Sequence, residues 1–368
     1  MKTVLVTGSD GFIGKNLVTR LRQEAVYAVL EYDKSTKVTL GSLVEKSDFI
    51  FHLAGVNRPQ NEAEFKTGNQ DLTDTILKLA APNKTPVLIT SSIQALLDNA
   101  YGKSKLGAES LVTAYGKTTG AKTYIFRLPN VFGKWSKPNY NSAVATFCYN
   151  IAHNLPVQIN DADAPITLVY IDEVIDEFIK CLTDQQATDT EGFCRIPTTY
   201  PTTVGKLAET IQALHSMRTS SIVPDLSDTL TKYLHATLTS FYEDSALAHV
   251  YDLHDDERGW LFELAKSNAF GQVFISSTKP GYTRGQHWHH TKVERFCVIK
   301  GEGEIRFRKV NSKETFSYAV TDAKIEIIDI PVGYVHSITN TGTSDMLLVI
   351  WANEIFDKNR PDTFYEEV

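Results

Sequence analysis

The strongest constraint on the fold is the order of patterns at the start of the chain. Residues Thr3–Val6 form a short apolar run, Gly8, Gly11 and Gly14 follow it, and Asn16–Gln23 has a helical pattern. Further strand patterns lie at Tyr27–Tyr32, Asp48–Leu53 and Val87–Ser91, with a helical pattern at Leu72–Ala81. Such alternation is typical of βαβ units, whose parallel strands are buried on both faces. The sequence therefore predicts an α/β domain built on a parallel sheet.

The residue pattern of the sequence changes after about residue 243. From Gly271 onward, Gly, Asn, Pro and Asp separate short runs that are rich in β-branched and aromatic residues: QVFIS, ERFCVI, EIRFRKV, KIEIIDI and MLLVIWA. Even spacing of short strands is typical of an all-β sandwich or barrel. We expect a domain boundary near residue 245, with one domain over 1–245 and a second over 246–368.

The composition excludes several classes of protein. Of the 368 residues, 42% are apolar and 22% are charged, which is typical of a globular protein and not of a disordered chain. The net charge of −7 argues against a nucleic-acid partner, and no apolar run approaches the roughly 20 residues that span a bilayer. The first glycine comes too early for a secretory segment, and the four cysteines form no CxxC pair. We therefore expect a cytoplasmic protein with reduced thiols.

The glycine turn indicates a dinucleotide site. Glycines let backbone N–H groups approach a pyrophosphate, and the N-terminus of the following helix favours negative charge. After the second strand pattern, Asp33 can bind a ribose 2′-hydroxyl, whereas Lys34 and Lys37 can accommodate a 2′-phosphate. The residues alone leave both NAD and NADP open.

Tyr101 and Lys105 form a candidate catalytic pair. Their spacing places both side chains on one face of a helix, where the ammonium group favours the phenolate and lowers the pKa of the phenol. A tyrosine tuned in this way can exchange a proton with a carbonyl oxygen. The spacing alone is expected by chance in this composition, but the pair follows closely after the strand pattern Val87–Ser91. The prediction of a catalytic pair therefore rests on its position after this strand and not on the spacing of the two residues.

These motifs resemble the extended short-chain dehydrogenase/reductase family over about residues 1–245. The turn reads TGxxGxxG, and DFIFHLAG, RLPNVFG and VYIDEV are similar to further segments of that family. The resemblance implies a Rossmann-type fold with a small sugar-binding subdomain. It implies cofactor contacts from Gly8, Gly11, Phe12, Ile13, Gly14, Leu53, Ala54, Gly55 and Lys105. It also implies that Ser92, or the neighbouring Ser91, hydrogen-bonds the substrate oxygen beside Tyr101.

Two kinds of reaction remain open for this domain. It can reduce a ketone with hydride from the nicotinamide, or it can act as a dehydratase or epimerase that recycles its cofactor. The 4,6-dehydratases of the family have an acid pair beside the catalytic serine, whereas Ile93, Gln94 and Ala95 follow Ser92 here. Simple reduction is therefore the favoured hypothesis.

A second candidate site lies in the C-terminal part. His287 and His289 are two residues apart and face one side of a strand, Glu294 belongs to the next strand pattern, and His336 follows later. Imidazoles with one carboxylate suit a divalent transition metal such as zinc, iron, manganese or nickel. The sequence therefore predicts a metal site made of these four residues.

This arrangement resembles the cupin family, which folds as a jelly-roll barrel. Its two motifs are met at Gly281, His287, His289, Glu294 and Gly301, and at Pro331, Gly333, His336 and Asn340. Only the leading glycine of the second motif is missing, and Ile325 stands there. The alternative is a metal-free cupin that uses a histidine as base, as sugar epimerases of this fold do. The segment DERGW (256–260) is similar to those epimerases, and His290 is a candidate base.

Both halves together resemble a family of bifunctional capsular polysaccharide enzymes, through HLAGVNRP, SSIQA, FGKWSKPNYNS, ATFCYNIA, HWHHTK, IRFR and DIPVGY. The resemblance implies that the cupin domain epimerises C3 of a UDP-2-acetamido-2,6-dideoxy-4-keto-hexose. The N-terminal domain then reduces the C4 ketone with NADPH to UDP-2-acetamido-2,6-dideoxy-L-talose. It further implies zinc, a homodimer, and contacts of the UDP-sugar with Arg58 and residues 137–142. The competing hypothesis is a metal-containing sugar-nucleotide sensor without turnover.

Overall fold

The computed structural model describes residues 1–248, 250, 252–310 and 312–368. These residues group into two compact units. The first unit contains residues 1–212 and 232–242, and the second contains residues 213–231 and 243–368. The long helix α8 (Val204–Ser220) therefore contributes residues to both units.

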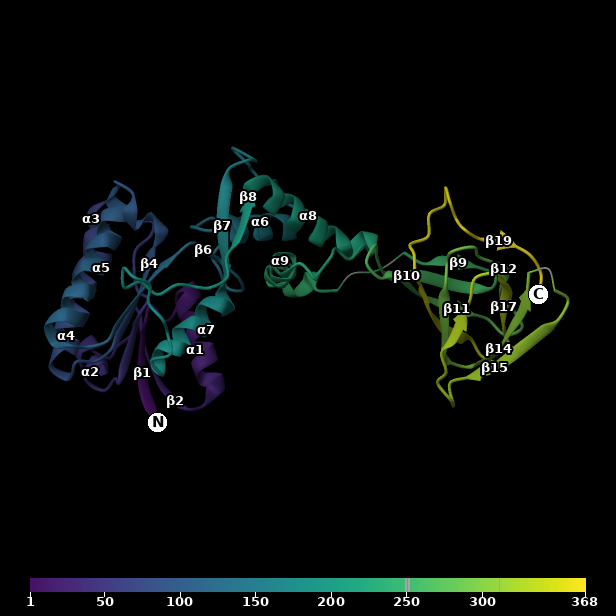
Figure 1. The fold of residues 1–368 in the computed structure, drawn as a ribbon, viewed down its shortest axis with the longest axis horizontal. Helices are drawn as coiled ribbons and strands as arrows, with labels where there is room; N and C mark the ends of the chain where they lie inside the picture. The colour runs from purple at the N-terminus through teal and green to yellow at the C-terminus, as the bar shows by residue number, and fades with distance from the viewer. Residues whose placement is uncertain (249, 251, 311) are drawn as a thin grey trace. The chain divides into compact units, whose positions relative to one another are not determined.

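A five-stranded parallel sheet in the order β2-β1-β3-β4-β5 forms the centre of the first unit. Its strands are β1 (Lys2–Thr7), β2 (Tyr27–Tyr32), β3 (Phe49–His52), β4 (Val87–Ser92) and β5 (Thr123–Leu128). One face is covered by α2 (Leu40–Glu45), α4 (Leu72–Ala80) and α5 (Ala100–Thr119), and the other by α1 (Phe12–Glu24) and α7 (Ile171–Leu182) (Figure 1). The predicted Rossmann-type sheet is confirmed.

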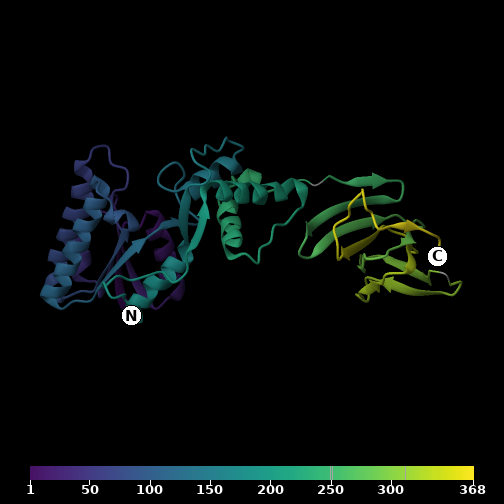
Figure 2. The same ribbon diagram turned by 45° about the horizontal axis from the view of Figure 1, so that its top comes forward.

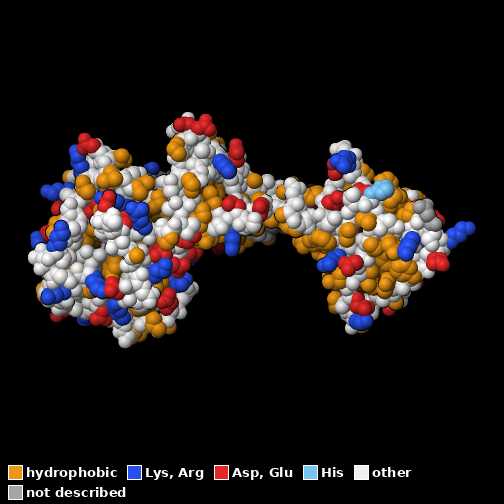
Figure 3. All heavy atoms as spheres, in the orientation of Figure 1, with side chains coloured by type: hydrophobic (Ala, Val, Ile, Leu, Met, Phe, Trp, Pro, Cys, Tyr) orange, Lys and Arg blue, Asp and Glu red, His pale blue; other side chains and the backbone are white. Residues whose placement is uncertain are grey.

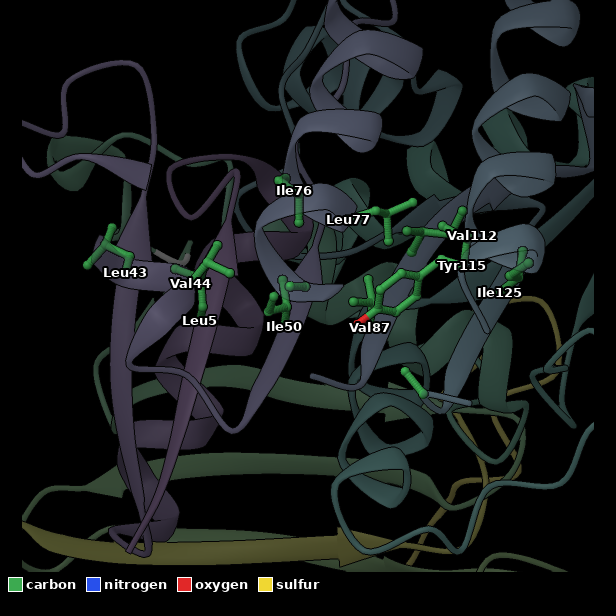
Figure 4. Packing of buried hydrophobic residues seen from close by; sticks show 13 residues of the cluster. Leu5, Leu43, Val44, Ile50, Ile76, Leu77, Val87, Val112, Tyr115 and Ile125 are labelled. Atoms are coloured by element: carbon green, nitrogen blue, oxygen red, sulfur yellow. The ribbon is translucent and has the colours of Figure 1, made fainter. Parts of the chain in front are cut away.

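Apolar side chains of the sheet and of α2, α4 and α5 form the core on one face of this sheet (Figure 4). Leu5, Ile50 and Val87 come from three neighbouring strands, and Ile76 and Val112 come from the helices that cover them; all five are fully buried. Each such side chain contributes about 1.5–3 kcal/mol when it is removed from water. This burial on both faces explains why the strands read as continuous apolar runs.

The remaining elements of the first unit are a small sheet and several helices. A three-stranded sheet in the order β6-β7-β8 follows β5 in the chain, and Tyr170, the last residue of the central strand β7, stacks on Tyr233 of α9 with ring centroids 3.9 Å apart. These elements are β6 (Asn130–Phe132), β7 (Pro165–Tyr170), β8 (Tyr200–Thr203), α6 (Ala143–Ala152) and α9 (Thr229–Thr239). Short helical turns are α3 (Ala63–Phe65), η1 (Lys66–Asp71), η2 (Ala81–Asn83), η3 (Ile93–Leu96) and, in the second unit, η4 (Asp244–Ala246).

Two antiparallel sheets make up most of the second unit, in the orders β16-β13-β18-β11-β10-β9 and β15-β14-β17-β12-β19 (Figures 1 and 2). The strands are β9 (His254–Asp256), β10 (Gly259–Ser267), β11 (Gly271–Thr278), β12 (Thr283–Trp288), β13 (Glu294–Lys300), β14 (Glu302–Lys309), β15 (Thr315–Thr321), β16 (Ile328–Ile330), β17 (Tyr334–Asn340), β18 (Met346–Ala352) and β19 (Phe364–Tyr365). Buried side chains such as Phe296, Phe307 and Leu348 fill the space between the sheets. The predicted all-β, cupin-like architecture is confirmed.

One predicted strand is shorter than its apolar run. Of KIEIIDI, only Ile328–Ile330 forms a strand, and Ile325 and Ile327 are 59% and 61% exposed. The chain turns after β15, Lys324 makes an isolated bridge with Thr321, and β13 pairs only with the last three residues of the run. The prediction of one strand over the whole run is therefore wrong, because the strand partner covers only its end.

On the face drawn in Figure 3, positively and negatively charged side chains are mixed: Lys and Arg alternate with Asp and Glu. Within the residues that the structure describes, no helix combines the length and the apolar character that crossing a bilayer requires.

Candidate active site and metal centre

The glycine turn lies between the end of β1 and the start of α1 and packs against the chain that follows β3. Gly8 has φ +72°, and a Cβ there would come within 2.6 Å of the backbone nitrogen of Ala54. A Cβ on Gly14 would lie 2.1 Å from the carbonyl oxygen of Gly8. Both positions therefore require glycine, and the turn presents bare backbone at the N-terminus of α1.

A cavity of about 600 Å³ opens beside this turn. Its lining includes most of the predicted cofactor and catalytic residues: Gly8, Gly11, Phe12, Ile13, Gly14, Leu53, Gly55, Ser92, Tyr101 and Lys105. Ala54 is not among the lining residues, although its backbone nitrogen packs against Gly8. The cavity therefore joins the glycine turn and the tyrosine–lysine pair, which are about 90 residues apart in the sequence.

Asp33 and Lys34 lie just outside the lining of this cavity. The Asp33 carboxylate accepts hydrogen bonds from the backbone nitrogens of Asp10 (3.0 Å) and Lys34 (2.7 Å), and Asp10 itself lines the cavity. The side chain of Lys34 is exposed. An acid and a cation thus stand together at the end of β2, as the sequence predicted, and both NAD and NADP remain compatible with this edge.

Helix α5 presents Tyr101 and Lys105 to the cavity. Asn99 caps the helix by accepting a hydrogen bond from the backbone nitrogen of Gly102 (2.8 Å), which fixes where α5 begins. The Ser92 hydroxyl hydrogen-bonds the Tyr101 phenol. The Lys105 ammonium donates to the carbonyl of Thr90 (3.2 Å) and lies 6.0 Å from the centroid of the Tyr101 ring. Serine, tyrosine and lysine thus converge at the end of β4.

The charges at this site follow from burial. Burial lowers the pKa of the Lys105 ammonium to about 8, although the Glu109 carboxylate raises it. Burial raises the pKa of Tyr101, the hydrogen bond with Ser92 lowers it, and the nearby phenol of Tyr140 raises it again. The phenol is therefore protonated at neutral pH and can donate its proton. The lowered pKa that its spacing to Lys105 predicts is wrong, because burial has the largest effect on this group.

Ser91 has a different role from Ser92. Its hydroxyl donates to the carboxylate of Glu109, which is 3% exposed and also pairs with Arg127 through Nε (3.0 Å) and Nη2 (2.7 Å). Arg127 stacks on the ring of Phe193, with its Cζ 3.9 Å from the centroid. The sequence reasoning missed Glu109, although it lies four residues after Lys105 and therefore one turn further along the helix.

The segment 135–142 forms a further wall of the cavity. Lys137, Tyr140, Asn141 and Ser142 line it, as does Trp135. The Lys137 ammonium lies 5.3 Å from the centroid of the Tyr140 ring. Arg58 is not among the lining residues; its guanidinium donates to the carbonyl of Asn139 (3.2 Å) and thus holds this segment from outside.

The four predicted metal ligands come together in the second unit. His287 and His289 come from β12 and the chain after it, Glu294 begins β13, and His336 lies on β17. Their ligand atoms all lie within 4.8 Å of one another. A β-bulge at Gln286, which has φ +60°, shifts the register so that His287 stands opposite His336.

These side chains fit a metal ion. Nε2 of His289 and of His336 lie 3.5 Å and 3.3 Å from Oε2 of Glu294, and all three atoms are buried without a hydrogen-bond partner among the described residues. The other ring nitrogens are held, Nδ1 of His289 by the carbonyl of Asp362 (2.6 Å) and Nδ1 of His336 by that of Tyr334 (3.3 Å). Buried unpaired polar atoms are costly, so three that converge indicate a ligand.

Burial sets the protonation of this cluster. It lowers the pKa of His287 to about 4, and the neighbouring His336 and His289 lower it further. For Glu294, burial raises the pKa, but the neighbouring imidazoles of His289 and His336 outweigh it and hold the pKa of this carboxyl group well below its usual range. A neutral imidazole beside a carboxylate is the state that binds a divalent cation.

A cavity of about 300 Å³ lies over the cluster and is lined by His287, His289 and Glu294. The buried Lys292 also lines it, and its ammonium donates to the carbonyl of Pro361 (2.9 Å). The exposed His290, the candidate base of the sequence analysis, is not among the lining residues.

Two family models match the chain. The NAD dependent epimerase/dehydratase family matches residues 4–194, and the polysaccharide biosynthesis C-terminal domain matches residues 254–364. A relative in Pseudomonas aeruginosa, UDP-2-acetamido-2,6-beta-L-arabino-hexul-4-ose reductase, is 43% identical over 364 residues, which cover 98% of this chain and 97% of that protein.

Solved structures agree with these matches. The capsular polysaccharide assembling protein CapF from Staphylococcus aureus is 41% identical over 99% of this chain and 100% of that chain, with a TM-score of 0.92. CapF with the inhibitor 3-isopropenyl-tropolone is 36% identical over all of both chains, with a TM-score of 0.88. UDP-glucuronic acid 4-epimerase from Bacillus cereus, 17% identical over 65% of this chain and 98% of that chain, shares the fold alone, with a TM-score of 0.54. The chain therefore belongs to the NAD dependent epimerase/dehydratase family, among the capsular polysaccharide proteins that join this domain to a polysaccharide biosynthesis C-terminal domain.

Proposed function

We propose that the chain is a bifunctional sugar-nucleotide enzyme. The second unit epimerises C3 of a UDP-2-acetamido-2,6-dideoxy-4-keto-hexose, and the first unit reduces the C4 ketone with NADPH to UDP-2-acetamido-2,6-dideoxy-L-talose for capsular polysaccharide synthesis. The observation that carries the reductase half is the convergence of Ser92, Tyr101 and Lys105 on the cavity beside the glycine turn. The 43% identity to a hexul-4-ose reductase over nearly the whole chain supports the substrate class.

The residues of the first cavity fit a nicotinamide dinucleotide, because Gly8 and Gly14 leave a cradle that a Cβ would fill. When bound, this cofactor supplies the hydride that reduces C4. The Tyr101 phenol donates its proton to the ketone oxygen, and Ser92 orients that oxygen through its hydroxyl. The Lys105 ammonium lies 6.0 Å from the centroid of the Tyr101 ring and stabilises the negative charge that remains on the phenolate after the proton has left.

NADP(H) is the proposed cofactor in preference to NAD. The Asp33 carboxylate is already engaged by two backbone N–H groups, while the side chain of Lys34 is exposed beside it and free to meet a 2′-phosphate. The resemblance of the whole chain to the bifunctional enzymes supports the same choice.

The second unit is proposed to hold a divalent metal ion, zinc by resemblance, through His287, His289, Glu294 and His336. When bound, this ion acts as a Lewis acid that favours loss of the proton next to a ketone. The surrounding residues exclude water from the buried ring nitrogens and keep His289 and His336 oriented through their Nδ1 atoms. The enzyme is further proposed to work in the cytoplasm as a homodimer, with the boundary between its two catalytic domains near residue 245 of the sequence.

One experiment tests both steps. The protein is incubated with a UDP-4-keto-6-deoxy-HexNAc in deuterated water, with and without NADPH, and the products are followed by NMR and mass spectrometry. We expect deuterium at C3 without NADPH and a new C4 alcohol only with it. If NADPH is not oxidised during turnover, the reductase assignment is wrong.

Variants separate an enzyme from a sensor. Tyr101→Phe removes the proton donor and should abolish reduction while cofactor binding persists. His289→Ala should abolish exchange at C3 and lower the metal content, while reduction of a pre-epimerised substrate survives. A protein without turnover on any 4-keto sugar nucleotide, yet with tight binding of it, would support the sensor hypothesis instead.

A further inference from the structure

The C-terminal segment 357–365 lies on the turn that carries the predicted metal ligands, and its central residue is Asp362. One oxygen of its carboxylate accepts the backbone N–H of His290 (3.0 Å). The other accepts the backbone N–H groups of Thr291 (2.8 Å) and Lys292 (2.9 Å) and the Thr291 hydroxyl (3.0 Å). A single side chain thus accepts hydrogen bonds from three consecutive backbone N–H groups between His289 and Glu294.

The backbone of Asp362 reaches the ligand itself. Its carbonyl oxygen lies 2.6 Å from Nδ1 of His289 and accepts the proton of that nitrogen. The proton is therefore held on Nδ1, and the lone pair of Nε2 is directed at the position near Glu294 where three buried atoms lack partners. One residue fixes both the turn and the tautomer of the imidazole.

The conformation of Asp362 is unfavourable in isolation. Its φ is +41°, a left-handed value that residues with a Cβ seldom adopt. Such backbone persists only where surrounding contacts determine it, and it is concentrated at functional sites. Here β19 (Phe364–Tyr365) pairs with His287 and Trp288 of β12, and the Lys292 ammonium donates to the carbonyl of Pro361. The two strands lie close together in Figure 1.

We propose that Asp362 is a positioning residue for the metal ion and that the C-terminal segment is part of the metal site. This inference rests on the metal site proposed above. Asp362 acts through His289. Its carboxylate holds the turn so that His289 and Glu294 keep their separation, and this hold keeps the Asp362 carbonyl on Nδ1 of His289, so that Nε2 is presented unprotonated.

The test compares metal binding by Asp362→Ala, Asp362→Asn and the control Asp357→Ala. Asp357 lies on the same segment, is exposed, and its carboxylate accepts a backbone N–H of Asn359 within its own turn. Metal is removed from the full-length protein, and zinc affinity is measured by competition with a chromophoric chelator. We expect a loss of about 10- to 100-fold for Asp362→Ala. Asp362→Asn keeps one acceptor oxygen and should fall between, and Asp357→Ala should match the wild type.

Cobalt loading adds a readout that loss of stability alone does not move. The visible absorption of bound Co²⁺ depends on the geometry of its ligands. A positioning role predicts an altered spectrum in Asp362→Ala and a smaller change in Asp362→Asn. If Asp362→Ala does not fold, as judged by circular dichroism, Asp362→Asn alone decides.

The possible outcomes are distinct. If the wild-type protein binds neither zinc nor cobalt, the proposed metal site is wrong and the inference falls with it. If the wild type binds and the Asp362 variants bind equally, the metal site stands and the role of Asp362 is refuted. Weaker binding with an unchanged cobalt spectrum also refutes a positioning role, because the ligands would then keep their arrangement without Asp362.

Discussion

The pair of Glu109 and Arg127 allows a quantitative prediction about the first unit. Glu109 is 3% exposed, and its carboxylate accepts hydrogen bonds from Ser91, Arg127 Nε and Arg127 Nη2. Glu109→Gln removes the charge at nearly constant volume and leaves the guanidinium without a carboxylate. Breaking a buried pair from one side costs about 3–5 kcal/mol. The Arg127 side chain is 19% exposed, so water relieves part of that cost and we expect about 3 kcal/mol.

Urea unfolding followed by circular dichroism measures this loss. With a slope of about 3 kcal/mol per molar urea, the midpoint of the first unit should fall by about 1 M. Glu24→Gln, which breaks the exposed pair with Arg20, is the control and should cost less than about 0.5 kcal/mol. The double variant Glu109→Gln/Arg127→Gln should be more stable than the sum of the two losses predicts.

The same variant has an effect on catalysis. Glu109 raises the pKa of Lys105, so its removal should move the limb of the pH–rate profile that depends on Lys105 to lower pH. The reasoning is refuted if Glu109→Gln costs less than 1 kcal/mol, or if the two single losses are simply additive. An unchanged pH profile in a destabilised variant would show that Glu109 supports the fold alone.

Three further predictions follow from the site and its surroundings. Tyr101→Phe should lower kcat of reduction by at least about 100-fold, and unchanged fluorescence titration with NADPH checks that binding persists. Gly14→Ala places a Cβ 2.1 Å from the Gly8 carbonyl and should abolish binding in the same titration; normal affinity would contradict the tight turn. Burial lowers the pKa of His52, held between Thr7 and Thr73, to about 3. Its unfolded form takes up a proton below pH 6.5, so stability is lost as pH falls from 6.5 to 3, by up to about 1.4 kcal/mol per pH unit. Urea unfolding of His52→Leu should show a shallower slope with pH; an equal slope would mean that His52 is not the group.

The sequence predicts the first unit closely because its signals are local. Strand β2 runs from Tyr27 to Tyr32 as expected, since continuous apolar runs between turns mark strands of a parallel sheet. Helix α1 begins at Phe12, earlier than the predicted Asn16, because the helix starts directly from the glycine turn. The structure brings Ser92, Tyr101 and Lys105 together, but their catalytic roles stay predictions.

Contacts between distant segments are what the sequence could not reveal. Asp362 meets His290 across 72 residues, and nothing in the local pattern of PDTFY marks it as a partner of the histidine turn. The spacing of His287 and His289 indicated a strand, but the bounds of β12 (Thr283–Trp288) could not be predicted, because its bulge interrupts the alternation that marks a half-buried strand. The four ligand candidates were predicted nevertheless, since their spacing is itself a motif.

The bulge at Gln286 decides which face of the sheet the side chain of His287 occupies, and so whether it reaches the metal centre. Side chains alternate between the two faces of a strand, so the face that His287 and His289 occupy depends on whether the number of residues before them is odd or even. If β12 paired regularly through this point, Gln286 would stand opposite His336 and His287 would turn to the other face of the sheet. A slip of the register by one residue would therefore remove a ligand without changing any residue. During divergence, such a strand tolerates substitutions far better than a loss of its bulge.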